Sequence, residues 1–129
     1  MQYNISGAEW RLMQVLWEKD KPMTSAEIVA QVNDGDNRSP RTIKTLLQRL
    51  VSKNFVTFTV DAADSRIYHY RANVTEDECV KKENQNFVSL YYKNDVGMML
   101  ARFIGDSDLN QEQIKKLTEL LEEKNGDEL

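Results

Sequence analysis

A stretch without a single acidic residue, Asn37 to Val60 (NRSPRTIKTLLQRLVSKNFVTFTV), constrains the fold of this chain more than any other feature. Its apolar residues recur at the spacing i, i+3, i+4, i+7 and i+8, namely Ile43, Leu46, Leu47, Leu50 and Val51. This spacing places them along one side of a helix, and such a stripe must be buried against other elements. The stretch therefore predicts an amphipathic helix that packs on a core.

The opposite side of this helix is basic and rich in hydroxyl groups. At about 100° per residue, it holds Arg41, Thr45, Gln48 and Ser52, flanked by Thr42, Lys44 and Arg49. Hydrogen-bond donors without carboxylates are suited to phosphates and base edges. We therefore interpret the helix as one that binds DNA. The alternative is an amphipathic helix whose outer side is basic by chance.

Both ends of this helix carry termination signals. Ser39 is expected to be the N-cap, with Pro40 at the first helical position, where its missing N–H costs nothing. At the other end, Lys53-Asn54 is expected to close the helix, because Asn tolerates the left-handed conformation. The first turn lies at the positive end of the helix dipole, which favours a bound anion.

Two shorter helices are expected before the basic one. Ser6-Gly7-Ala8-Glu9 is a capping box that opens a helix to about Glu18, and Thr24-Ser25-Ala26-Glu27 opens another that ends near Asn33. A turn over Asn33–Asn37 then leads to the basic helix. This succession predicts a helix-turn-helix. The two tryptophans of the first helix are expected in the core rather than on a base-stacking surface.

Two runs of β-branched and aromatic residues follow, Phe55–Val60 and Ile67–Tyr70, joined by a loop over Asp61–Arg66. Three helices closed by a β-hairpin predict a winged helix. Arg66 is the cation placed to reach a DNA backbone, but the acidic residues of the loop oppose it, so a weak contribution is expected. His69 is expected to be a surface or hydrogen-bonded strand residue rather than a metal ligand.

The charge balance changes after residue 73. Residues 1–73 hold ten basic and eight acidic residues, whereas residues 74–129 hold seven and thirteen. The acidic half is expected to form three helices, starting at Thr75, Asp95 and Asn110 and ending near Tyr92, Gly105 and Asn125-Gly126. We predict a mostly α fold with a small β-hairpin, with a winged-helix DNA-binding domain over 1–73 and a helical dimerisation domain over 74–129.

The apolar residues of the acidic half are too few for an independent core. Burial against a second copy of the chain is expected, and the alternative is that these helices pack back on the first domain. The residues predicted for dimerisation are Phe87, Leu90, Tyr91, Met98, Phe103, Ile114, Leu117, Leu120 and Leu121.

Several function classes are disfavoured by the residues that are present. The chain has one His and one Cys, Cys79, and no Gly-rich phosphate loop, so neither an enzyme nor a metal site or cofactor is expected. No apolar run approaches a membrane span and no signal-peptide pattern is found, so a cytoplasmic protein is expected. A winged-helix protein-interaction module that does not bind DNA remains the alternative function.

These motifs make the sequence resemble the penicillinase-repressor family, which includes the β-lactamase, methicillin-resistance and copper-operon repressors. The matching segments cover nearly the whole chain and are Ile5–Trp10, Val15–Trp17, Ser39–Leu50, Arg66–Tyr70 and Leu109–Leu117. The resemblance implies a homodimeric repressor on a palindromic double-stranded DNA operator, with the tail helices as the dimer interface. The predicted DNA-binding residues are Ser39, Arg41, Thr42, Lys44, Thr45, Gln48, Arg49, Lys53 and Arg66.

The sequence departs from the family pattern at positions that concern induction. The copper branch carries paired Cys-x-Cys motifs near its C-terminus, whereas this chain ends EEKNGDEL and Cys79 stands alone. The β-lactamase branch is cleaved at an Asn-Phe bond in the tail, and the aligned bond here is Arg102-Phe103. Arg38 stands where members often have Trp. The sequence therefore does not identify the inducing signal or a regulatory protease.

Overall fold

The computed structural model describes residues 5–32 and 39–127. Its elements are α1 (Gly7–Lys19), α2 (Ser25–Val32), α3 (Pro40–Ser52), β1 (Val56–Val60), β2 (Tyr68–Ala72), α4 (Glu76–Tyr92), α5 (Val96–Asp106) and α6 (Gln111–Asp127). The predicted turn over Asn33–Asn37 lies outside the described residues, and so does Arg38, which departs from the family pattern. The chain divides into two units, residues 1–83 and 84–129, which are described separately.

The predicted helix starts are confirmed in the first unit. Ser6 and Glu9 form a reciprocal capping box at the start of α1, with both backbone-to-side-chain distances at 3.1 Å. Thr24 and Glu27 do the same at α2, at 3.0 and 3.2 Å. Each box satisfies two backbone N–H groups that a helix leaves without an internal partner. Local sequence alone therefore sets where these helices begin.

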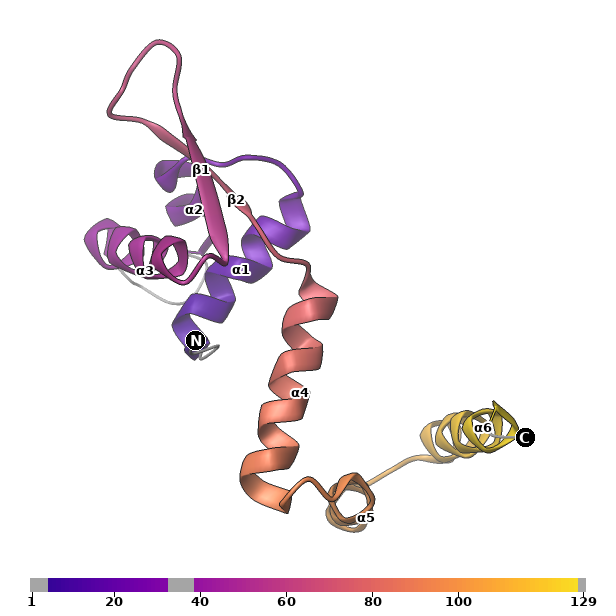
Figure 1. Ribbon diagram of the computed structural model, residues 1–129. Coiled ribbons are helices and arrows are strands. Elements are labelled where there is room, and N and C mark those ends of the chain that lie inside the picture. The colour runs from indigo at the N-terminus through magenta and orange to yellow at the C-terminus, as the bar shows by residue number, and fades with distance from the viewer. Residues whose placement is uncertain (1–4, 33–38, 128–129) are drawn as a thin grey trace. The chain divides into compact units, whose positions relative to one another are not determined.

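The core of the first unit lies where α1, α2 and α3 meet the base of the hairpin (Figure 1). Its fully buried side chains are Leu12, Met13, Ile28, Val32, Ile43, Leu47 and Leu50. Burial of a side chain of this size contributes about 1.5–3 kcal/mol, so the stripe of α3 holds that helix firmly in one rotational setting. Trp10 and Trp17 pack against this core half-buried, with their rings edge to face at 5.4 Å.

Strands β1 and β2 pair antiparallel, from Val56 opposite Ala72 to Val60 opposite Tyr68. The predicted hairpin is confirmed, but three of its strand ends differ from the prediction. Phe55 precedes β1 because its N–H bonds to the Leu50 carbonyl at the end of α3. Strand β2 begins at Tyr68 rather than Ile67 and continues to Ala72, two residues past Tyr70. The fold is therefore mostly α with a small β-hairpin, a winged helix, as predicted.

A third segment joins this sheet at a single point. Met23, in the connection between α1 and α2, exchanges two 2.8 Å backbone hydrogen bonds with Tyr70. Asn54, with φ 67°, adopts the left-handed conformation expected after α3. The short turn after α3 and the Met23 bridge together attach the hairpin to the helices at its base, and its loop extends beyond them (Figure 1).

The start of α4 is part of the first unit. Thr75 accepts the N–H of Glu78 at 3.1 Å, as its capping role predicts. The indole Nε1 of Trp17 donates to the Val74 carbonyl at 2.9 Å, and Cys79 is buried. These contacts attach the start of α4 to the first unit, and the division between the two units falls within this helix.

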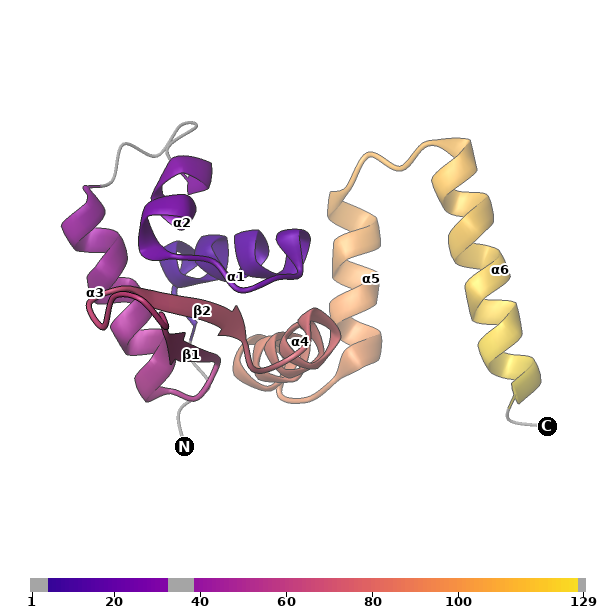
Figure 2. The same cartoon turned by 90° about the horizontal axis from the view of Figure 1, so that it is seen from above.

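The second unit consists of the rest of α4, α5 and α6 (Figure 2). Asp95 caps α5 and Asn110 caps α6, as predicted. Helices α5 and α6 end later than predicted, at Asp106 and Asp127, because neither Gly105 nor Gly126 adopts a positive φ. No described helix is long and apolar enough to cross a membrane.

Candidate nucleic-acid interface

The outer side of α3 is the candidate interface. Its inner residues Ile43, Leu46, Leu47 and Leu50 are all buried, which turns the other side of the helix to solvent. The exposed residues on that side are Arg41, Lys44, Thr45, Gln48 and Arg49. The rotational setting predicted from periodicity is the one observed. Long donors and a hydroxyl therefore project from a helix whose backbone is fixed by the core.

Hydroxyl groups at the start of α3 are held by local hydrogen bonds. The Oγ of Ser39 accepts the N–H of Thr42 at 3.2 Å and lies 2.9 Å from its hydroxyl. The hydroxyl of Thr45 donates to the carbonyl of Arg41 at 3.1 Å. Ser39 is thus an N-cap, and Thr45 keeps its oxygen available only as an acceptor. Such fixed hydroxyls are suited to recognising donors on base edges.

The cations of this side lack an acidic partner among residues 5–32 and 39–127. Within the described part of the chain, no carboxylate forms an ion pair with Arg41, Lys44 or Arg49. Three positive charges on one side of a helix create a field that attracts a polyanion. The charges and the hydrogen-bond donors of this side are therefore directed away from the core and toward solvent.

Lys53, another predicted DNA contact, lies differently. Its Nζ forms an ion pair with Glu9 at 2.9 Å, and the Glu9 side chain is only 3% exposed. Burial by itself raises the pKa of Glu9, but hydrogen bonds from Lys53 and Ser6 outweigh it and bring the pKa below its ordinary value of 4.5. The charge of Lys53 is therefore engaged by the start of α1, so it is less available to a phosphate than that of Lys44.

A groove of about 440 Å³ runs beside α3. Its walls come from α3, the hairpin and the start of α2, and its lining residues are Lys44, Gln48, Arg66, Ile67, Tyr68, Tyr70, Thr24, Ser25 and Ala26. None of these residues is acidic. Three of the predicted DNA-binding residues, two on α3 and Arg66 in the hairpin loop, therefore share one surface. The other lining residues had not been predicted to contribute.

The hairpin loop carries paired charges. Nε and Nη2 of Arg66 donate to the two carboxylate oxygens of Asp64, each at 3.0 Å. His69 Nε2 lies 2.8 Å from Asp61 Oδ1, which agrees with a hydrogen-bonded strand histidine. Hydrogen bonds from Arg66 lower the pKa of Asp64, and hydrogen bonds from His69 and the loop backbone lower that of Asp61. Both carboxylates are therefore ionised near neutral pH, and they offset the charge of Arg66.

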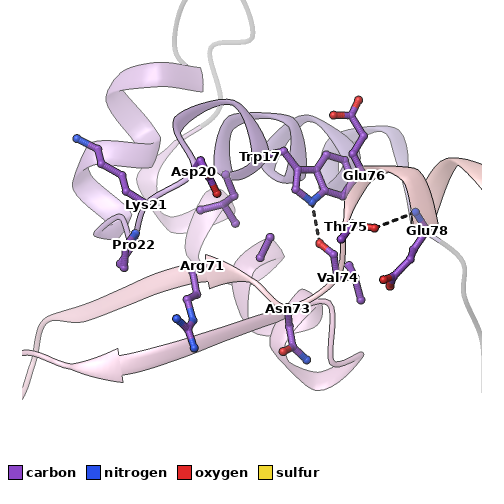
Figure 3. A pocket seen from close by; sticks show the side chains of 12 residues that line it. Trp17, Asp20, Lys21, Pro22, Arg71, Asn73, Val74, Thr75, Glu76 and Glu78 are labelled. Carbon is purple, nitrogen blue, oxygen red and sulfur yellow. Dashed lines mark hydrogen bonds between the residues drawn. The ribbon is translucent and has the colours of Figure 1, made fainter.

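A larger concavity of about 680 Å³ lies on another side of the first unit, between the end of α1, the end of β2 and the start of α4 (Figure 3). Its lining mixes Lys21 and Arg71 with Asp20, Glu76 and Glu78, and no residue of α3 contributes. Its only hydrogen bonds drawn in Figure 3 join its own residues, such as Trp17 to Val74. Among the described residues no group of three His, Cys, Asp or Glu could hold a metal ion.

The residues predicted for dimerisation lie in the second unit, and most are exposed. The exposed ones are Phe87, Leu90, Tyr91, Met98, Phe103, Ile114, Leu120 and Leu121, and Leu117 is half-buried. Phe87 and Phe103 approach to 5.7 Å between ring centroids, which joins α4 to α5. The Arg102-Phe103 bond lies within α5 with both side chains exposed.

Comparison with known proteins places these features in context. The penicillinase repressor family model matches residues 5–123. The methicillin resistance regulatory protein MecI of Staphylococcus aureus strain N315 is 32% identical over 95% of this chain and 96% of its own. The penicillinase repressor of Staphylococcus aureus is 31% identical over 93% and 92%. The DNA-binding domain of the repressor BlaI superposes with a TM-score of 0.50 at 29% identity, over 58% of this chain and 87% of that domain.

Proposed function

The chain belongs to the penicillinase repressor family, and we propose that it is a cytoplasmic transcriptional repressor that binds a palindromic DNA operator as a homodimer. Helix α3 of each subunit enters the major groove. The two copies contact successive grooves on one side of the duplex, about 34–36 Å apart. Occupation of promoter DNA then blocks transcription sterically.

The observation that carries this proposal is the exposed side of α3. It combines three cations without a carboxylate partner in the described chain with donors and hydroxyls of defined position. Arg41 lies in the first turn, where a side chain of a recognition helix reaches base edges, so we assign it a bidentate contact to guanine. Lys44 and Arg49 are assigned to phosphates, together with the hydroxyl groups at Ser39 and Thr42.

The role of Lys53 changes in this assignment. Its ion pair with Glu9 places its ammonium group at the junction of α1 and α3. A phosphate would have to compete with a buried carboxylate for it. We therefore assign Lys53 mainly to stability. A phosphate would likewise have to compete with Asp64 for the guanidinium group of Arg66, so the contribution of Arg66 to phosphate binding is small.

Dimerisation is proposed from the apolar side chains of the second unit. Leu90 and Leu121 are 73% and 58% exposed within the single chain. Solvated leucines on several successive helices cost hydrophobic free energy that a partner surface recovers. A second copy provides an identical surface, and its twofold symmetry matches that of a palindromic operator.

The test begins with selection of bound fragments from genomic DNA by the wild-type protein. Affinity for the selected sites and for random DNA is then measured by fluorescence anisotropy at several salt concentrations. Arg41→Ala should cost about 1–3 kcal/mol on selected sites and relax one operator position. Lys44→Gln should weaken binding to all sequences and reduce the salt slope by about one. Lys19→Gln, an exposed lysine at the end of α1, is the matched control and should change neither.

Retention of wild-type affinity and sequence preference by Arg41→Ala contradicts the role of α3. Absence of salt-dependent binding to any DNA by the wild-type protein contradicts the function as a whole. In that case the winged helix acts as a protein-interaction module.

A further inference from the structure

The two faces of the hairpin differ in chemistry along their whole length. Residues directly opposite each other in an antiparallel pair project to the same side. Thr57, Thr59, His69 and Arg71 therefore form one face, which is polar, as expected for strands exposed to water. Val56, Phe58, Val60, Tyr68 and Tyr70 form the other face, which is apolar and aromatic.

The apolar face extends beyond the core that it helps to build. Val56 and Tyr70, near the base, are 2% and 9% exposed, whereas Phe58 and Tyr68 are 37% and 38% exposed. The rings of Phe58 and Tyr68 stack at 4.5 Å with an angle of 10° between their planes. Packing on the core explains the burial of Val56 and Tyr70 but not the presence of aromatic residues farther along this face. The outer pair forms a stacked, solvent-exposed surface, and the Tyr68 hydroxyl has no hydrogen-bond partner among the described residues.

The surroundings of Tyr68 indicate what covers this face. Tyr68 lines the groove beside α3 together with Lys44, Gln48 and Arg66. That groove contains cations, an amide and hydroxyls but no acidic residue, so its chemistry is complementary to a sugar–phosphate strand. It is also continuous with the exposed side of α3, since Lys44 and Gln48 belong to both. An apolar protein partner would find no matching apolar residue on the α3 side of this groove.

We propose that the aromatic face of the hairpin packs against the deoxyribose-phosphate strand next to the recognition helix, with the Tyr68 hydroxyl donating to a phosphate. The Phe58 ring supports Tyr68 from behind and fixes its position. In this arrangement the hairpin contacts DNA through an uncharged face, while the guanidinium group of Arg66 in its loop is held by Asp64. The inference rests on the proposed function and adds Tyr68 and Phe58 to the contacting or positioning residues.

The experiment compares Tyr68→Phe, which keeps the stacked ring, with Tyr68→Ala, which removes it. Thr59→Val is the matched control, because it removes a hydroxyl from the opposite face of the same hairpin. Affinities for the selected genomic sites and for random DNA are measured over a range of salt concentrations. Thermal unfolding of each variant checks the fold, and phosphate-ethylation interference locates the contacts on the DNA.

Loss of one hydrogen bond should lower affinity about three- to tenfold in Tyr68→Phe. The salt slope should stay unchanged because no charge is removed, and the unfolding temperature should match that of the wild type. Interference at one phosphate in each half-site should disappear. Tyr68→Ala should lose more affinity than Tyr68→Phe, and Thr59→Val should behave like the wild type.

Unchanged affinity and interference in both Tyr68 variants, while Arg41→Ala still weakens binding, overturns this inference and leaves the proposed function in place. A change in oligomeric state without a change in DNA affinity also overturns it, because a second copy of the chain would then cover the face. Failure of the wild-type protein to bind DNA in a salt-dependent way contradicts the proposed function itself.

Discussion

The ammonium group of Lys53 lies 2.9 Å from Oε2 and 3.0 Å from Oε1 of Glu9, which joins the end of α3 to the start of α1. Glu9 is 3% exposed and also closes the capping box with Ser6. One buried carboxylate therefore begins a helix and helps to fix a second one. The ion pair holds the end of α3 near Arg49, on which the proposed DNA contact depends.

Replacement of Glu9 by Gln should destabilise the first unit by about 2 kcal/mol, since it removes the charge of a buried carboxylate that accepts two hydrogen bonds from the Lys53 ammonium group. Urea unfolding followed by circular dichroism measures the loss. Glu27→Gln is the control, because Glu27 has the same capping role at α2 but is exposed. Equal losses in the two variants would show that capping alone, and not the ion pair, carries the effect.

Stability should also depend on pH through Glu9. Its pKa in the folded protein lies below the ordinary value of 4.5, so the folded state binds this proton less readily than the unfolded chain. The stabilisation is therefore complete above pH 4.5 and is lost as the pH falls through the folded pKa. The difference in unfolding free energy between wild type and Glu9→Gln should be constant from about pH 6 to 8 and shrink below about pH 4. A constant difference across this whole range would contradict the assignment.

Removal of the ion pair between Arg66 and Asp64 should strengthen DNA binding. Asp64→Asn removes the negative charge that pairs with Arg66 at 3.0 Å but keeps an oxygen to accept the backbone N–H of Arg66. Affinity for random DNA at low salt should rise about three- to fivefold, and the salt slope should steepen by about one, because one more cation reaches a phosphate. Fluorescence anisotropy at several salt concentrations measures both quantities.

The control for this gain is Glu18→Gln, which changes the net charge equally on α1. An equal gain in the two variants would mean that overall charge, and not the position of Arg66, governs the effect.

The proposed homodimer should dissociate when one apolar side chain of the second unit is replaced by a charged one. Leu121→Lys places an ammonium group on the apolar stripe of α6, where burial in a dimer would be costly. Sedimentation equilibrium at micromolar concentration should then find a monomer, and affinity for a full operator should fall toward that for a half-site. Glu119→Lys, on the opposite side of α6 by helical periodicity, is the control and should remain dimeric. A dimeric Leu121→Lys variant would exclude α6 from the interface.

The chain's local patterns were sufficient for much of the fold. The capping boxes at Ser6 and Thr24 and the caps at Ser39 and Asn110 form hydrogen bonds over three residues, so the identity of neighbouring residues decides them. The apolar period of α3 likewise determined which side faces solvent. The ends of α5 and α6 were misplaced, since glycine permits a left-handed termination but does not require one.

Contacts between residues that lie far apart in the sequence could not be predicted from such local patterns. The pairing of Lys53 with Glu9, the bridge from Met23 to Tyr70 and the burial of Cys79 all depend on how separate elements pack together. The groove that gathers Lys44, Arg66 and Tyr68 arises for the same reason. The sequence by itself determined the helices, the hairpin and the outward side of α3, because these follow from interactions between neighbours. Only the tertiary structure decided which cations pair with distant carboxylates and which aromatic residues stay exposed, because each answer depends on side chains that folding brings together.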